Sequence, residues 1–555
     1  MPEVSKEVYF KEVLKQMPRI VSLLDRNISS ETYGCFDREH WNYSTSDIAQ
    51  TRKQEAVLTL ALLYKINRED NPYYKNDTIL EWINAAINFW AKIQQQDGSF
   101  NNLYPNEHSF VATAFSSYSV SETLLQLDNK LQNREKIIFG LEKAARWLRF
   151  HKETHVWNQE CGAAISLYNI SLLTKNMEYE KWAGEKINQL IKSQSKEGWF
   201  YEYGGADIGY LSLSIDYLAK FYQKTKDRKV MESLQKAVDF ITYFIHPNYT
   251  FGGIYGSRNT EYLIPHGFEI LSKDIPNAQL ISYYVRKSLD QKTTIAPFSL
   301  DDKYLLYLSY TYLQAYLDAN ENAEVCTPIF NENFSKNFDH CGIYIFSNKN
   351  FYLIVNYKKG GVVKLIFKQN GRSLNDGGII IQDLDKKNLT SCWVTIDNKI
   401  SSVQEGLTIS GYLRFILHNK ITPWRNLFLR GFQMICGKSE YVSSKVKEIL
   451  RNILILKTKK SLLNFGREIS INEQRVRIID EIDNYPTINK LIIASKSAFI
   501  YGESSNYFQL SDLDFLPIIY NRDALEKFKD ARKIRVIREY DANSRLVESI
   551  MQGVQ

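Results

Sequence analysis

The segment ILEWINAAINFWAKIQQQDGSF, residues 79–100, holds in one stretch the pattern that decides the fold. Its apolar residues Leu80, Ile83, Ile87 and Trp90 recur at the three- and four-residue spacing of one helix face. A glycine follows, which supplies the positive φ that ends a helix, and then an aromatic residue that can fold back over the turn. The segment therefore predicts an amphipathic helix that is closed by a tight glycine turn.

The same design returns along the first 325 residues. SQSKEGWF (193–200) and NYTFGGIYG (248–256) again place a glycine turn and an aromatic residue after a helical pattern. Helical periodicity also occurs in eight further segments, at about 54–66, 110–127, 136–150, 161–174, 178–194, 209–224, 230–245 and 303–319. Repeated helix pairs joined by such turns predict a barrel or incomplete toroid of helical hairpins.

After about residue 326 the apolar period changes from that of a helix to two, which is typical of strands. The strand-like segments are 341–347, 351–357, 361–368, 378–382, 392–396, 475–482, 490–501 and 533–540. The expected fold class is therefore α+β multidomain. Residues 1–325 are expected to form an N-terminal (α/α) toroid, and residues 326–555 a C-terminal antiparallel β-sandwich.

Composition excludes several classes of protein. With 44% hydrophobic and 24% charged residues in 555, the chain is neither disordered nor a coiled coil, and no apolar run reaches the length of a membrane span. Six scattered cysteines without a C-x-x-C pair are interpreted as free core thiols, so neither a metal nor another cofactor is expected. The N-terminus lacks the pattern of a signal peptide, which predicts a cytoplasmic protein, or a periplasmic or secreted one if a leader was removed.

The net charge of +7 is unevenly distributed. Residues 1–325 hold 36 Lys and Arg against 40 Asp and Glu, whereas the remaining residues hold 34 against 23. The basic stretch KVKEILRNILILKTKK (445–460) alternates as a strand would, so it is interpreted as a solvated strand face. No Walker A, RNP-like or helix-turn-helix motif occurs, and no nucleic-acid partner is expected.

Polar residues that a plain helical scaffold does not need gather at predicted helix ends. They lie in five segments, 34–43, 106–110, 155–160, 198–210 and 252–269. The last two combine tyrosines, a tryptophan, carboxylates and Arg258 around glycines. Aromatic rings stack on the apolar faces of sugars, and the polar groups bind hydroxyls and carboxylates. The expected partner is therefore an acidic polysaccharide or oligosaccharide; the oligomeric state is left open.

These motifs resemble those of the polysaccharide lyases built as an (α/α) toroid followed by a β super-sandwich, which include the chondroitin AC lyases and the heparinase II/III-like proteins. The resemblance rests on Asn158, on the turn GWFYEYGGADIGY (198–210) and on Arg258 in the next loop. It implies that Tyr210 is the catalytic tyrosine, while Tyr203 stands where the family has a histidine. An imidazole could instead come from another loop, through one of three histidines, His266, His108 or His40.

The resemblance implies β-elimination from a uronic acid. Asn158 and Arg258 would bind the carboxylate and stabilise the charge that develops when a base removes H5, and a tyrosine or the same base would protonate O4. The base is left open between a tyrosine and a histidine. The expected catalytic residues are Asn158, Tyr203, Tyr210, Arg258 and His266. The expected substrate-binding residues are His40, Trp41, His108, Gln159, Trp199, Glu202, Asp207, Glu261 and Tyr262.

Three other functions remain open. An α/α-barrel glycoside hydrolase would use a pair of carboxylates, and the sequence offers four of them, Glu202, Asp207, Glu261 and Glu269. A uronate epimerase would share the proton abstraction without cleaving the chain. A non-enzymatic protein would only bind the glycan. Terpene cyclases have similar turns, but SLDD (299–302) lacks the first Asp of their acid motif.

Overall fold

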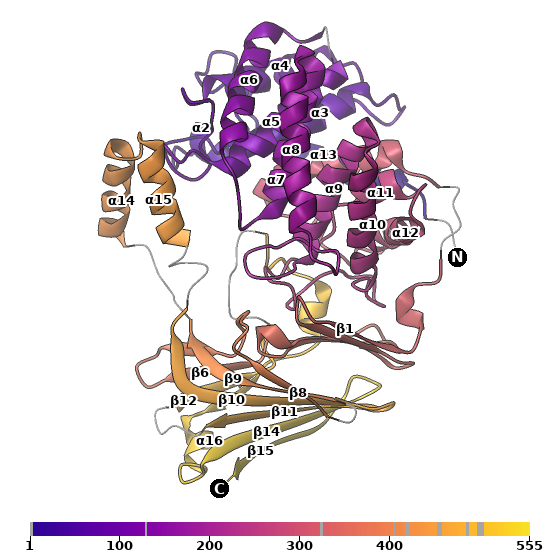
Figure 1. Ribbon diagram of the computed structural model, residues 1–555, viewed down its shortest axis with the longest axis vertical. Helices are drawn as coiled ribbons and strands as arrows, with labels where there is room; N and C mark the ends of the chain where they lie inside the picture. Colours follow the sequence, from indigo (N-terminus) through magenta and orange to yellow (C-terminus); the bar gives the residue numbers. More distant parts are fainter. Residues whose placement is uncertain are drawn as a thin grey trace.

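The structure, a computed structural model, consists of a helical toroid and a β domain (Figure 1). It describes residues 4–127, 130–321, 326–403, 406–416, 422–451, 458–483, 488–496 and 504–554. The toroid helices are α1 (Glu7–Ser22), α2 (Arg38–Trp41), α3 (Ala56–Lys65), α4 (Asp77–Lys92), α5 (Phe110–Leu127), α6 (Arg134–Phe150), α7 (Trp157–Thr174), α8 (Met177–Ser193), α9 (Ile208–Thr225), α10 (Arg228–Thr242), α11 (His266–Leu271), α12 (Pro276–Asp290) and α13 (Asp302–Asp318). All nine predicted helical segments are confirmed, whereas α1, α2, α11 and α12 were not predicted.

The toroid has an inner and an outer layer of helices. Helices α3, α5, α7, α9, α11 and α13 contact one another in this order, and α13 returns to α3. Most of these inner helices are buried on nearly all sides, which suits their apolar and small residues. The outer helices α4, α6, α8 and α10 bury one apolar face each. Their connections to the inner helices gather at the ends of the toroid.

Two of the glycine turns are held by the same arrangement of hydrogen bonds. Gly98 and Gly198 have φ values of 95° and 101°, which favour glycine. Gln94 and Gln194, at the ends of the outer helices α4 and α8, each donate to the carbonyl of the turn glycine at 3.0 and 2.8 Å. Each also donates to a carbonyl of the next outer helix, at 2.8 and 2.9 Å. The repeated sequence design therefore corresponds to a repeated structure.

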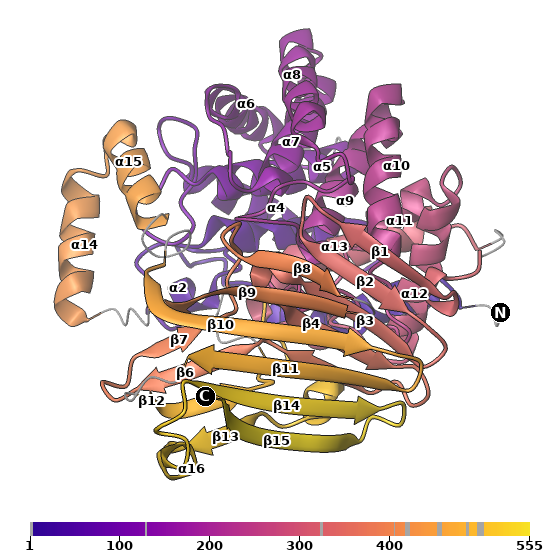
Figure 2. The ribbon, with the colours of Figure 1, turned by 60° about the horizontal axis from the view of Figure 1, so that its bottom comes forward.

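The β domain contains two antiparallel sheets (Figure 2). The smaller has the order β1-β2-β3-β4-β5, and the larger has ten strands in the order β13-β12-β6-β7-β9-β10-β11-β14-β15, with β8 paired to β9. The strands are β1 (Phe334–Phe338), β2 (Ile343–Ser347), β3 (Phe351–Asn356), β4 (Val362–Phe367), β5 (Ser373–Asp376), β6 (Ile379–Asp383), β7 (Asn388–Thr390), β8 (Lys399–Val403), β9 (Gly406–Phe415), β10 (Lys460–Ile471), β11 (Arg475–Asp483), β12 (Ile488–Ile493), β13 (Ile518–Asn521), β14 (Lys533–Asp541) and β15 (Leu546–Val554).

The central strands β3 and β4 of the smaller sheet are buried on both faces. In β3, Tyr352 and Ile354 belong to the core shared with the toroid, whereas Leu353 and Val355 belong to the core between the sheets. Because side chains alternate along a strand, one sheet serves both cores. This explains why β3 and β4 have apolar residues at nearly every position rather than at every second one; the exceptions are Asn356 and Lys364. The small sheet thus fixes the toroid against the β domain.

Two details of the sequence-based assignment differ from the structure. Residues 392–396 form an irregular segment after β7, not a strand. The basic stretch 445–460 is not a strand face, because Glu440–Arg451 forms helix α15, in which apolar residues follow the helical period, and β10 begins only at Lys460. Residues 452–457 and residues 497–501, the end of a predicted strand, lie outside the described residues. The predicted domain boundary at residue 325 also lies there, between α13 and β1.

The six cysteines are free thiols, as predicted. Cys35, Cys161, Cys341 and Cys392 are buried, but Cys326 is exposed and Cys436 only half-buried, so the core prediction is wrong for those two. Among the described residues, no helix combines the length and the apolar character that crossing a bilayer requires.

Candidate active site

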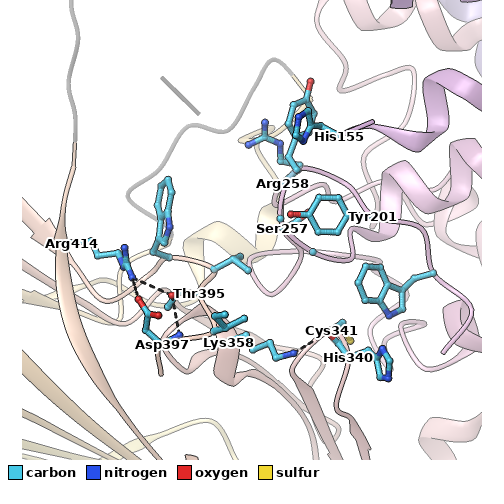
Figure 3. A pocket seen from close by; sticks show the side chains of 17 residues that line it. His155, Tyr201, Ser257, Arg258, His340, Cys341, Lys358, Thr395, Asp397 and Arg414 are labelled. Atoms are coloured by element: carbon cyan, nitrogen blue, oxygen red, sulfur yellow. Dashed lines mark hydrogen bonds and ion pairs between the residues drawn. The ribbon is translucent and has the colours of Figure 1, made fainter. Parts of the chain in front are cut away.

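A cleft of about 580 Å³ lies where the toroid meets the β domain (Figure 3). Loops that precede α7, α9 and α11 form one wall, and loops and strand β9 of the β domain form the other. The lining residues are His155, Trp199, Tyr201, Tyr203, Gly204, Gly205, Ser257 and Arg258 from the toroid, and His340, Cys341, Lys358, Trp393, Val394, Thr395, Ile396, Asp397 and Arg414 from the β domain.

The toroid wall is built around a tight turn at Tyr203 and Gly204. Both residues have positive φ, 48° and 115°, so the backbone reverses there. The amide of Tyr203 donates to the carbonyl of His155 at 2.8 Å, which brings the segment before α7 onto the same wall. The ring of Tyr203 faces the guanidinium of Arg258, with the guanidinium carbon 3.8 Å from the ring centroid. A cation and a phenol therefore stack on this wall.

Asp207 fixes the loop that carries Arg258. Its carboxylate accepts from the amide of Arg258 at 2.9 Å and from the hydroxyl of Thr260. It also caps α9, because it accepts from the amide of Tyr210 at 3.3 Å. Gly209 permits this close approach: a Cβ there would lie 2.5 Å from the hydroxyl of Thr260. The start of α9 and the Arg258 loop therefore form one rigid unit.

The β domain holds the same loop from the other side. Lys359 is fully buried, and its ammonium donates to the carbonyls of Ile254 and Gly256, at 2.8 and 2.6 Å, and to the side chain of Asn259. Burial lowers the pKa of Lys359 to about 8. Lys359 is thus a clamp between the domains, and its neighbour Lys358 lines the cleft.

Removal of this clamp has an expected cost. In Lys359→Met, three oxygen atoms in the interface lose their donor, so the free energy of unfolding should fall by roughly 2–4 kcal/mol. Chemical denaturation measures this change. The matched control is Lys387→Met, because Lys387 is an exposed lysine of the same domain. Equal stability of the two variants would show that Lys359 is no clamp.

The wall formed by the β domain carries two basic side chains, Lys358 and Arg414, and the ring of Trp393. The guanidinium of Arg414 donates to Asp397 at 2.6 Å and to Thr395 at 3.1 Å (Figure 3). The ammonium of Lys358 donates to the carbonyls of Asp339 and His340, at 2.9 and 3.0 Å. The described lining residues include three cationic side chains, Arg258, Lys358 and Arg414, and one carboxylate, Asp397. The cleft therefore favours anionic ligands.

Glu197 joins the two walls. Its carboxylate accepts from the indole N–H of Trp199 at 2.8 Å, and from the amides of His340 and Cys341 at 2.7 and 3.1 Å. Trp199 is thereby held in the cleft wall rather than merely packed in the helical hairpin. The hydrogen bonds of Glu197 thus hold the toroid wall and the β-domain wall of the cleft together.

Of the predicted site residues, Tyr203, Arg258 and Trp199 line the cleft. Asn158 lies in the first turn of α7, where its backbone amide and side-chain amide donate to Glu202 at 3.0 and 2.9 Å. Both residues are buried, and burial raises the pKa of Glu202 well above its usual range. In this structure the side-chain amide of Asn158 therefore hydrogen-bonds Glu202.

Tyr210 lies behind the Tyr203 turn, in the first turn of α9. Its hydroxyl pairs with the hydroxyl of Ser504 at 2.8 Å. Burial raises the pKa of Tyr210 well above its ordinary value, and the positive charge of Arg258 offsets part of this rise. Tyr203, Tyr210 and Arg258 thus lie within electrostatic reach of one another.

The other predicted residues lie elsewhere. His266 lines a second cavity of about 290 Å³ near the opposite ends of the inner helices and pairs with Asp318 at 2.7 Å. Glu261 pairs with Lys496 at 3.1 Å, and Asp207 is the cap described above. The remaining five are bound into loops or buried in the toroid: His40 to the Ser46 carbonyl, Trp41 to the Leu23 carbonyl, His108 to Asp97, and Gln159 and Tyr262 in the interior.

Sequence reasoning missed most of the second wall. His155 opens one of the polar segments at helix ends, but it was not singled out. Lys358, Trp393, Asp397 and Arg414 had no comparable signal, because the strand-like pattern around them indicates a scaffold. Only the packing of the β domain on the toroid places them at the site.

No family model matches the chain, and no curated protein does. Solved structures do. A chondroitin AC lyase from Streptomyces coelicolor A3, in complex with chondroitin sulphate, is 9% identical; the match covers 88% of this chain and 68% of the lyase, with a TM-score of 0.56. A mutant of that lyase is 8% identical, with the same coverage of both chains and a TM-score of 0.51. A heparan sulfate lyase from Pedobacter heparinus is 13% identical, with 88% and 70% covered and a TM-score of 0.40. The match with chondroitin AC lyase shows that the chain shares the fold of that lyase, a helical toroid followed by an antiparallel β domain.

Proposed function

We propose that this chain is a polysaccharide lyase that cleaves a uronic-acid-containing polysaccharide by β-elimination in the cleft between toroid and β domain. The observation that carries the proposal is the stack of Arg258 on Tyr203, on a wall that faces Lys358 and Arg414. The fold shared with chondroitin AC lyase supports it. A cation beside a phenol can supply the two things that proton abstraction next to a carboxylate needs, a base and a positive charge that stabilises the carbanion.

The cations would bind the substrate and stabilise the developing charge. Removal of H5 places negative charge on C5 and on the adjacent carboxylate of the uronic acid. Arg258 lies in a nearly buried position, where a guanidinium interacts with charge more strongly than in water. Lys358 and Arg414 would bind the anionic groups of neighbouring units. Trp199 and Trp393 offer ring faces for the sugars.

Tyr203 is the proposed base. An opposite charge within a few ångströms favours the ionised form of a phenol, and the guanidinium of Arg258 lies 3.8 Å from the ring centroid. The phenolate would take H5, the electron pair of the C5–H bond would form the C4–C5 double bond, and the C4–O4 bond would break. The His155 ring lies on the same wall, close to Arg258 (Figure 3).

Tyr210 is the proposed acid. Its raised pKa keeps the phenol protonated, and the charges of Tyr203 and Arg258 both act on it. It would donate its proton to the leaving O4. In this scheme Asn158 holds Glu202, and thereby the turn that carries Tyr203, while His266 takes no part.

The hydrolase alternative lacks support from the cleft. Its four candidate carboxylates are engaged by structural partners; Glu269, for example, forms two bonds with Arg286, at 2.8 and 2.6 Å. Among the described lining residues, the single carboxylate is Asp397, which pairs with Arg414. A hydrolase needs two carboxyl groups several ångströms apart across the scissile bond.

The proposal is tested by incubating the protein with a panel of uronic-acid polymers. Ultraviolet absorbance of the unsaturated uronate and new reducing ends should rise together. Reducing ends without absorbance would indicate a hydrolase. Incorporation of solvent deuterium into the uronic acid without chain cleavage would indicate an epimerase. Binding of the polymer without cleavage or deuterium incorporation would indicate a glycan-binding protein.

The pH dependence of kcat/KM is expected to show one limb. The rate should rise as the base ionises, and it should not fall again below about pH 10, because burial keeps the proton on Tyr210. Initial rates over a pH series at constant ionic strength measure this profile. A falling limb near neutrality would instead assign the acid to an imidazole, with His155 the candidate in the cleft.

A further inference from the structure

An inserted helical hairpin projects from the β domain beside the toroid (Figures 1 and 2). It consists of α14 (Pro423–Ile435) and α15 (Glu440–Arg451), and it lies between β9 and β10. These two strands are antiparallel neighbours in the large sheet, so a short turn could connect them. The sheet itself therefore does not require the hairpin.

One face of the hairpin is attached to the toroid. The side chain of Asn106 donates to the Gln433 carbonyl at 3.1 Å, and the Ser443 hydroxyl donates to the Asn106 carbonyl at 3.0 Å. Arg430 pairs with Asp47 at 3.2 Å. These contacts fix the orientation of α14 and leave its opposite face directed away from the toroid.

The opposite face of α14 is apolar and exposed. At about 100° per residue, its five large apolar side chains fall within an arc of about 120°. Their exposed fractions are 80% for Trp424, 63% for Leu427, 74% for Phe428, 65% for Met434 and 79% for Ile435. A surface of this kind on a soluble domain marks an interaction site.

The charges around this face are positive. Helix α14 has no acidic residue and carries the exposed Arg425, and the turn after it carries the exposed Lys438, whereas Arg430 is paired with Asp47 of the toroid. Lys459 and Lys460 are exposed where the chain re-enters the sheet. Three of the five stripe residues, Leu427, Met434 and Ile435, have no ring face on which a sugar could stack. An apolar stripe with Trp and Phe, flanked by basic residues, suits the interface of an anionic bilayer.

We propose that α14 is a membrane-surface anchor that inserts its apolar face into anionic lipid headgroups. Trp424 and Phe428 would enter the boundary between headgroups and acyl chains, and Arg425 and Lys438 would contact lipid phosphates. This property is independent of the proposed lyase reaction. Its consequence is that the cleft would work next to an anionic membrane surface.

Vesicle co-sedimentation of the full chain tests the proposal. Binding to phosphatidylcholine vesicles that contain phosphatidylglycerol should exceed binding to pure phosphatidylcholine. Trp424→Ser with Phe428→Ser should weaken it roughly ten-fold or more, since two apolar anchors are lost. Arg425→Gln and Lys438→Gln should each weaken it about five-fold at low salt. The matched control is Phe150→Ser, because Phe150 is 80% exposed on α6, outside the hairpin.

Two results would overturn the proposal. One is wild-type protein that does not bind the anionic vesicles, or binds them equally well after the α14 substitutions. The other is a dimer in light scattering that the Trp424 and Phe428 substitutions dissociate, which would make a second copy of the chain the occupant. Unchanged thermal unfolding of the variants, whose altered side chains are exposed, shows that any loss of binding is not a loss of fold.

Discussion

Arg258→Gln is expected to lower kcat by roughly 10²–10³-fold, because the substitution removes the cation that stabilises charge on the uronic acid in the transition state. In the proposed mechanism the same cation favours the phenolate of Tyr203 as the base, so the rising limb of the pH profile should move to higher pH. Steady-state kinetics with the best polymer of the panel measure both effects. The backbone amide that anchors this residue to Asp207 is retained in the variant.

Two matched variants separate catalysis from binding. Arg414→Gln removes a cleft guanidinium on the opposite wall, so it should raise KM several-fold with little change in kcat. Arg258→Lys keeps the charge but loses the planar face on Tyr203, and it should lie between wild type and Arg258→Gln. If Arg258→Gln changed only KM, Arg258 would be a substrate-binding residue, and the proposed role in the transition state would be wrong.

Tyr203→Phe and Tyr210→Phe are each expected to lower kcat by roughly 10²–10⁴-fold on the polymer, because each removes one of the two proton-transfer groups. A substrate with fluoride in place of O4 distinguishes them. Fluoride leaves without protonation, so Tyr210→Phe should recover most of the wild-type rate on this substrate. Tyr203→Phe should stay slow, because H5 must still be removed.

The control for the tyrosine pair is Tyr201→Phe, since Tyr201 lines the cleft but lies outside the Arg258 stack. It should keep kcat within about a few-fold of wild type. Recovery of Tyr203→Phe rather than Tyr210→Phe on the fluoride substrate would exchange the two roles. Near-normal turnover of both variants on the polymer would remove the tyrosines from the mechanism and direct attention to His155.

The helical half of the fold could be predicted from local signals. The glycine turns at Gly98 and Gly198 end helices through their own backbone conformation, so a short window of sequence contains the cause. The basic stretch 445–460 misled for the opposite reason. Over a few positions its apolar residues fit both a strand and a helix. Helix α15 also belongs to an insertion between two strands, and the strand pattern around it gives no sign of that insertion.

The candidate site could be predicted only on one wall. Tyr203 and Arg258 stand in unusual polar loops, and such loops are a signal that sequence alone provides. Asn158 and Glu202 were chosen for the same reason, but their mutual hydrogen bonds engage them in the wall. Lys358 and Arg414 come from a domain about a hundred residues or more further along the chain, and no local pattern could place them opposite Arg258.

Product mass tests the central claim most directly. The protein is incubated with a uronic-acid polymer of the panel that it cleaves, and the new non-reducing ends are analysed by mass spectrometry. Arg258→Gln serves as the inactive control. The proposed β-elimination predicts ends that are lighter by one water molecule than those of hydrolysis and that carry a C4–C5 double bond. Saturated ends with the full mass of hydrolysis, made by wild type and not by the control, would contradict the account.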